Sequence, residues 1–310
     1  MSLTALRCDL HVHSVHSGRV NLPVLRHFGN DSYSEPRAVY ETARARGMDL
    51  VTLTDHDTIE GALAIAHLPG TFVSEEVTCE LSAGRQLHVN VFGIDEAQHS
   101  RITRLRCDPE ALFSYLREQG IAASVNHLFS AVTGPRELAD IVLALQGVGL
   151  VEVRNGMMPE EINSWAEEAS RAHRLGPVAG SDGHTLASVA RAWTEVAASS
   201  VEDFLAGVRA GAGQPAGRHG RYARTTADVI RNFRGGYREL APRALCGLSD
   251  LVRFAALLAA TLALPVAPLV TAALQVRDLL FAERFGAAWR ATLERPSRFR
   301  HLGTAAPAEG

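Results

Sequence analysis

The sequence predicts an α/β fold in which parallel strands alternate with helices and close into a distorted barrel, followed by an apolar helical extension. Two observations predict the barrel. Short apolar runs alternate with amphipathic stretches for about seven units, as in βαβ architectures. Residues able to bind metals recur just after these runs, at the rim where α/β barrels build their active sites. The sequence also has no Gly-x-Gly-x-x-Gly motif after a strand, which disfavours a dinucleotide-binding fold.

The expected strands are short and apolar, and most end in polar residues. The first runs from Ala5 to Leu10 and leads into His11-Val12-His13. The further strands are expected at 50–54, 71–73, 88–93, 121–125, 148–153 and 177–179.

The expected helices fill the intervals between these strands. The first starts at Glu35-Pro36, because proline suits the first helical position, and ends at Gly47. Further helices are expected at 58–67, 108–120, 137–145 and 160–174. The polar stretch 16–34 is expected to be a loop long enough to cover an active site.

Composition excludes some classes of function. All 31 basic residues are arginine, so a P-loop lysine and Schiff-base chemistry are excluded. The net charge of −3 gives no general attraction to nucleic acid or to anionic membranes. The four cysteines are widely spaced, which is typical of a reducing compartment. With no uninterrupted apolar run near the N-terminus, these features predict a cytoplasmic location.

The second half of the chain has a different character. A helix is expected at 201–210, followed by a Gly/Arg-rich loop at 211–224. Residues 254–276 carry no charge, and their length would allow them to span a bilayer. Pro265 and Pro268 interrupt the segment, so a membrane-associated hairpin, or two helices packing on the barrel or on a second subunit, are the alternatives. We therefore expect a barrel at 1–200, extending at most to about 240, and an extension at 201–310.

Five clusters of potential ligands follow expected strands. Residues two apart in an extended chain share a face, so His11 and His13 present two imidazoles side by side. An isolated His-x-His pair is as readily two surface histidines. The other clusters make a single metal site the better interpretation; they are Asp55-His56, Glu76, His127 and Asp182/His184.

These motifs resemble those of the PHP (polymerase and histidinol phosphatase) superfamily, in the same order, over about residues 5–195. The resemblance rests on Asp9-Leu10-His11-Val12-His13-Ser14, Thr54-Asp55-His56-Asp57-Thr58, Glu76, Asn126-His127 and Gly180-Ser181-Asp182-Gly183-His184. It implies a distorted (β/α)7 barrel that holds two or three divalent metal ions, and phosphoesterase activity.

The resemblance also implies the ligand sets. His11, His13, Glu76 and Asp182 would hold one metal, Glu76 would bridge to a second bound by His88 and His127, and His56 and His184 would contribute to a third. Mixed imidazole and carboxylate ligands suit zinc, manganese or iron, whereas magnesium prefers more oxygen.

One position departs from the family pattern. The family usually continues its first motif with Ser-Asp-Gly, in which the aspartate binds the third metal, but this chain has Ser17-Gly18-Arg19. Either His16 or Asp31 could replace the carboxylate, or the third metal could be weak or absent; of the two residues we favour His16.

Other residues near the rim are candidates for substrate binding. Arg19, Arg154 and Asn155 could bind a phosphate through charge-assisted hydrogen bonds, or form surface ion pairs. Asp55 could orient His56 or another ligand.

The favoured function is hydrolysis of phosphate esters by attack of a metal-bound hydroxide. The first motif and Thr54–Thr58 look closest to the branch that acts on nucleoside phosphates and RNA ends. The expected partner is thus a small phosphorylated substrate or a short nucleic acid end. The alternative is a regulatory metal-binding module that supports a membrane or partner complex, or self-association, through 254–276. A metal-dependent amidase is a third possibility, disfavoured by the lack of a lysine ligand.

Overall fold

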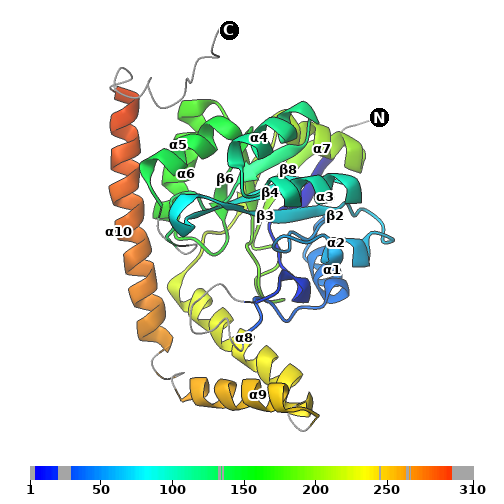
Figure 1. Ribbon diagram of the computed structural model, residues 1–310. Helices are drawn as coiled ribbons and strands as arrows, with labels where there is room; N and C mark the ends of the chain where they lie inside the picture. Colours follow the sequence, from blue (N-terminus) through cyan, green and yellow to red (C-terminus); the bar gives the residue numbers. More distant parts are fainter. Residues whose placement is uncertain are drawn as a thin grey trace, which may run out of the picture.

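The computed structural model describes residues 4–19, 29–131, 134, 136–243, 246–262, 265 and 267–294, and has a mixed α/β fold (Figure 1). The described strands form two sheets. The first has the order β2-β1-β8-β9 and the second β3-β4-β5-β6-β7. The strands are β1 (Thr4–Asp9), β2 (Leu50–Val51), β3 (Ser74–Glu80), β4 (Gln86–Phe92), β5 (Ala122–Val125), β6 (Leu150–Asn155), β7 (Gly176–Gly180), β8 (Ala192–Ala198) and β9 (Gln214–Gly217).

Helices surround the sheets. The predicted helices correspond to α1 (Pro36–Ala45), α2 (Glu60–Ile65), α4 (Pro109–Glu118), α5 (Leu138–Gly147), α6 (Glu160–His173) and α7 (Val201–Arg209). The prediction missed α3 (Glu96–Leu105) and the strands β8 and β9. Because β9 pairs with β8, residues 214–217 belong to the first sheet, and the helical extension of the structure begins with α8 (Tyr222–Arg243).

The prediction of a closed barrel of parallel strands was wrong. The described strand ladders do not close, and the backbone bridges between the two sheets, such as Val12–Gly183 and His56–Glu76, are isolated ones. Moreover, β3 pairs antiparallel with β4, β4 with β5, and β1 with β8. For β3 and β4 the physical reason is the short connection at Ser82–Gly84, which joins them without a crossover helix. A connection of that length permits only an antiparallel hairpin.

The strand preceding Glu76 also differs from the prediction. Residues 71–73 were expected to form it, but β3 starts at Ser74, and Thr71 makes only an isolated bridge with Val51. Glu76 therefore lies within a strand and not after its end. Its side chain nevertheless reaches the predicted site, because side chains within a strand alternate between the two faces of the sheet.

The apolar segment 254–276 is divided between two helices. It covers the end of α9 (Leu248–Thr261) and the start of α10 (Ala267–Glu294). Within the described part of the chain, no helix combines the length and hydropathy needed to cross a bilayer. Figure 1 shows α10 running along one side of the molecule beside α5 and α6, with α9 next to α8 at one end. This arrangement matches the alternative of two helices packed on the remainder of the chain.

Helix α10 belongs to the main core through Trp289. The indole is fully buried, its ring lies 6.0 Å from that of Phe129, and its Nε1 lies 3.3 Å from His173 Nε2. Since Phe129 lies beyond the end of β5, this contact fixes the extension to the domain that carries the predicted site.

We expect Trp289→Ala to lower the free energy of unfolding by about 3–5 kcal/mol, because it removes a large buried aromatic side chain and leaves a cavity. Chemical denaturation monitored by circular dichroism measures the change. Leu293→Ala, at a position that is 41% exposed on the same helix, is the control. Equal stability of the two variants would contradict the packing of α10 on this core.

Candidate metal centre

The two histidines after β1 are each held through one ring nitrogen. His11 Nδ1 lies 2.7 Å from Glu152 Oε1, and His13 Nδ1 lies 2.8 Å from Ser17 Oγ. These contacts direct both Nε2 atoms toward the same buried space, where neither has a hydrogen-bond partner. Histidines that bind metals are typically oriented in this way, with the second nitrogen bound to a carboxylate or hydroxyl group.

Glu76 lies at the centre of the site. It is 1% exposed, and its two oxygens face different sets of histidines. Oε2 lies 3.2 Å from His11 Nε2, 3.5 Å from His13 Nε2 and 3.2 Å from His56 Nδ1, whereas Oε1 lies 3.2 Å from His88 Nδ1 and 3.3 Å from His127 Nε2. Burial alone would raise the pKa of Glu76, but the surrounding imidazoles lower it well below its usual value. Glu76 is therefore ionised and able to bridge two cations.

Asp182, just after β7, completes the first ligand group. Its Oδ1 lies 3.5 Å from His11 Nε2 and 3.4 Å from His13 Nε2, and its Oδ2 accepts a hydrogen bond from Asn155 Nδ2 at 3.1 Å. The backbone there is strained, with φ of +52° for Asp182 and +32° for His127. Such conformations cost energy and cluster at functional sites, where the surrounding structure enforces them.

The close approach of β7 to the end of β1 requires a glycine. A Cβ at Gly180 would lie 2.3 Å from His11 Cβ, which is too close for any side chain. Gly180 thus allows Asp182 to reach the histidines, and this explains a glycine at that position of the motif.

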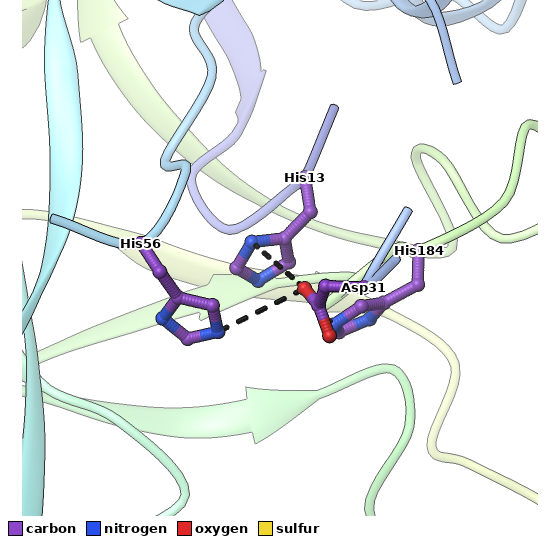
Figure 2. Close-up of side chains that lie close together, drawn as sticks. All are labelled: His13, Asp31, His56 and His184. Carbon is purple, nitrogen blue, oxygen red and sulfur yellow. Dashed lines mark ion pairs between the residues drawn. The ribbon is translucent and has the colours of Figure 1, made fainter. Parts of the chain in front are cut away.

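A further group is formed by His13, Asp31, His56 and His184 (Figure 2). Asp31 Oδ2 lies 3.0 Å from His184 Nε2, 3.8 Å from His56 Nε2 and 4.0 Å from His13 Nδ1. Burial favours the neutral form of Asp31, but these histidines, His184 foremost, lower its pKa to about 2. Asp31 is therefore a carboxylate at neutral pH.

His16, the residue that we favoured as the replacement ligand, is not part of this group. Its Nδ1 lies 3.2 Å from Glu60 Oε2, and its side chain is one-third exposed. The reason is local: residues 15–17 form a single 3-10 turn that points His16 toward the start of α2. The structure instead brings Asp31 to the three histidines, although it lies thirteen positions after Gly18.

The remaining predicted residues occupy different places. Asp55 accepts hydrogen bonds from the Ser14 and Ser17 hydroxyls at 2.7 and 2.9 Å, so it supports His13 through Ser17 and does not contact the ring of His56. Asn155 binds Asp182, as described. Arg154 donates to the Gly217 carbonyl at 3.2 Å and is not among the groups gathered around Glu76, and Arg19 is exposed beside Gly18.

One supporting residue was missed by the sequence analysis. Glu152 is 2% exposed and binds His11 Nδ1, the His127 amide at 3.0 Å and Asn155 Nδ2 at 2.9 Å. It therefore connects three residues of the site. Its signal was present in the sequence, since a lone carboxylate inside the apolar run Leu150–Val153 must be paired when buried.

The donor set fits divalent metal ions. Eight of the nine predicted metal ligands fall into overlapping groups whose ligand atoms lie within 4.8 Å of one another; these are His11, His13, His56, Glu76, His88, His127, Asp182 and His184. Several of their buried atoms have no hydrogen-bond partner within the described residues, among them both ring nitrogens of His88. Buried polar atoms are seldom left unpaired, so bound cations would satisfy them.

Comparisons with known proteins agree with this geometry. Residues 160–212, which include Asp182 and His184, match the PHP-associated family. An uncharacterized protein of Methanocaldococcus jannaschii, MJ1587, is 28% identical over 151 residues, which are 48% of this chain and 82% of that protein. The family match over residues 160–212 agrees with the resemblance to the PHP superfamily that the motifs indicated.

Two solved structures have a similar arrangement of elements. PsfC of Pseudomonas syringae PB-5123 is 16% identical, with 74% of this chain and 97% of PsfC covered and a TM-score of 0.50. The lesion-specific endonuclease PfuEndoQ of Pyrococcus furiosus is 15% identical, with 71% of this chain and 60% of that protein covered and a TM-score of 0.49. The likeness to PsfC shows a common fold.

We expect Glu152→Gln to weaken metal binding by roughly 10- to 100-fold, because His11 loses the carboxylate that orients its ring. Titration of the metal-free protein with manganese measures the affinity, and Glu161→Gln, on the exposed side of α6, is the control. Unchanged affinity would show that Glu152 has only a structural role.

Proposed function

We propose that this chain belongs to the PHP superfamily and is a metal-dependent phosphoesterase. The observation that carries the proposal is the position of Glu76, whose two oxygens face separate sets of histidines. A carboxylate so placed can bridge two cations. Two-metal sites of this kind recur in phosphatases and nucleases.

The residues of the site would bind two ions. His11, His13 and Asp182 would hold one ion and His88 and His127 a second, with Glu76 between them. Manganese, zinc or iron suits this mixture of nitrogen and oxygen ligands. Bound ions would activate a water molecule and stabilise the charge on the phosphoryl oxygens.

The third group gives the site a further cation position. Asp31, His56 and His184 gather around His13, so an ion there would add to the positive charge of the centre. Arg19 is exposed next to Gly18 and close in sequence to His13, and we propose it as the arginine that contacts a substrate phosphate.

The proposed substrates are nucleotides or the phosphorylated ends of short RNA. The resemblance of the first motif and of Thr54–Thr58 to the branch that acts on such substrates supports this choice. A cytoplasmic location is part of the same proposal, supported by cysteines that are unpaired in the described structure.

The proposal predicts that His13→Ala and Asp182→Ala remove bound metal and abolish turnover together, because both residues serve the same ions. Elemental analysis and hydrolysis of an aryl phosphate with added manganese, followed by nucleotides and short RNA, measure the two effects. His67→Ala, at an exposed histidine just after the end of α2 that belongs to none of the ligand groups, should leave both unchanged.

Other outcomes distinguish the alternatives. Unchanged activity in both variants would refute the assignment of the site. Stoichiometric metal without turnover of any phosphoester would favour a regulatory metal-binding module. Turnover of an amide in place of a phosphoester would favour the amidase.

A further inference from the structure

The third ligand group depends on a loop that is distant from the first motif. Gly18 stands where the family has an aspartate, and Asp31 takes its place in space because its amide donates to the Gly18 carbonyl at 2.9 Å. Arg19 and Asn30 form a β-bridge beside this contact. The carboxylate therefore arrives from a separate segment of chain, and that segment must be held in position.

Helix α8 holds this loop through residues on one of its faces. Asn232 Nδ2 donates to the Asp31 carbonyl at 2.7 Å, and Glu239 Oε2 accepts from Asn30 Nδ2 at 2.9 Å. Between them, a Cβ at Gly235 would lie only 2.7 Å from the ring of Tyr33, which packs directly on the helix. The spacing 232, 235 and 239 follows the period of a helix, so a single face of α8 supports the loop.

Helix α10 holds a second loop of the site. Asp278 is 4% exposed and accepts from Ser130 Oγ at 2.9 Å and from the Ala131 amide at 2.7 Å. Arg277 Nη2 donates to the Ala131 carbonyl at 3.0 Å. This turn begins at His127, whose carbonyl accepts from the Ser130 amide, so α10 supports the loop that presents His127.

We propose that the C-terminal helices position residues of the metal centre. Asn232 and Glu239 are positioning residues for Asp31, and Asp278 is a positioning residue for the loop of His127. The inference rests on the metal centre proposed above, but not on the reaction or its substrate. It assigns to 222–294 a role beyond packing, because the hydrogen bonds reach the Asp31 carbonyl, its neighbour Asn30 and the turn that follows His127.

The test is the number and affinity of manganese ions bound by the full-length chain. We expect Asn232→Ala to weaken one ion by roughly tenfold and to leave the other two unchanged, the same selective loss as in Asp31→Asn. Arg234→Ala, an exposed residue on the same helix, is the control. Thermal unfolding of the metal-free proteins tests whether Asn232→Ala merely loosens the fold, which would weaken all ions together.

The outcomes separate this inference from the proposed function. Three ions of unchanged affinity in Asn232→Ala, or equal weakening of every ion, would overturn the role of α8 while leaving the metal centre intact. The role of α8 would also be overturned if the wild-type chain bound only two ions and Asp31→Asn bound the same number with the same affinity. A wild-type chain that binds no metal would overturn both proposals.

A second and independent observation concerns the outer surface of the extension. Of the thirteen large apolar side chains that are exposed in the described residues, ten lie on α9, on α10 or between them. They are Leu248, Leu251, Val252, Leu258, Leu262, Leu269, Val270, Val276, Leu280 and Leu293. An exposed apolar patch of this kind marks an interaction site.

The exposed surface of α9 is formed mainly by apolar side chains. Its charged residues, Asp250 and Arg253, are only 17% and 19% exposed and face each other at 3.6 Å. By contrast, Leu248 is 76% and Leu262 85% exposed. A surface helix normally exposes its polar face to water. The exposure of the apolar face of α9 therefore indicates that another apolar surface covers it.

The charge around the patch favours an anionic lipid surface as that cover. Residues 221–277 contain eight arginines and three acidic residues, although the chain as a whole has a charge of −3. Arg234 and Arg238 are exposed on α8, against which α9 packs, whereas Arg243 is paired with Glu239 and Asp250. Apolar side chains flanked by arginines suit the interface of an anionic membrane, whereas a second copy would bring like charges together.

We propose that α9 and the first half of α10 dock on anionic membranes without crossing them. Co-sedimentation of the full chain with phosphatidylcholine vesicles, with and without phosphatidylserine, should show binding only with the anionic lipid, and salt should weaken it. Leu258→Glu should abolish binding, whereas Leu63→Glu, at a position that is 38% exposed on α2, should not.

Three results would overturn the lipid assignment. Equal binding to both kinds of vesicle would remove the role of the arginines. A chain that ignores vesicles and forms a dimer that Leu258→Glu dissociates would show that a second copy covers the patch. A monomer that binds neither vesicle would show that α9 is not a docking surface for lipid.

Discussion

The structure depends on the burial of the Glu76 carboxylate among five imidazoles. A charged group in such a place is costly unless opposite charge surrounds it, and here the imidazoles lower its pKa. Yet the histidines also carry nitrogens that face one another without hydrogen-bond partners. The chain tolerates this arrangement because bound cations can coordinate the nitrogens and the oxygens at once. The strand ends, the strained backbones and the close contact at Gly180 all place ligands of this one centre.

The candidate ligands could be found in the sequence because they lie close to strands. His11, Asp182 and His127 follow apolar runs directly, and the expected runs are near the observed strands. The relative direction of the strands was harder to predict. The periodicity of residues 74–92 does not reveal that the two strands form a hairpin, because a strand has the same sequence pattern in parallel and in antiparallel pairing. Glu152 left a signal as well, a lone carboxylate inside an apolar run. Asp31 could be named only as an alternative to His16, because contacts with a helix two hundred residues later place it.

The C-terminal helices contact the candidate metal centre from two sides. Trp289 anchors α10 to the core beside Phe129, and Asp278, three turns earlier on the same helix, binds the loop of His127. On α8, Asn232 binds the loop of Asp31. Two helices that contribute no ligand themselves thus contact segments on either side of the centre. A rigid support of this kind limits the movement of ligands, and precise placement is what metal binding requires.

The backbone at Gly18 explains why the family's aspartate is absent and why a helix is needed in its place. Gly18 has φ of +76° and ψ of −140°, a conformation that glycine adopts easily and other residues do not. Its carbonyl accepts a hydrogen bond from the amide of Asp31, so the backbone conformation that disfavours other residues at 18 also receives the segment carrying the replacement carboxylate. An aspartate within the motif would be held by its own tight turn. One on a distant loop has no such local restraint, and the hydrogen bond from Asn232 supplies it.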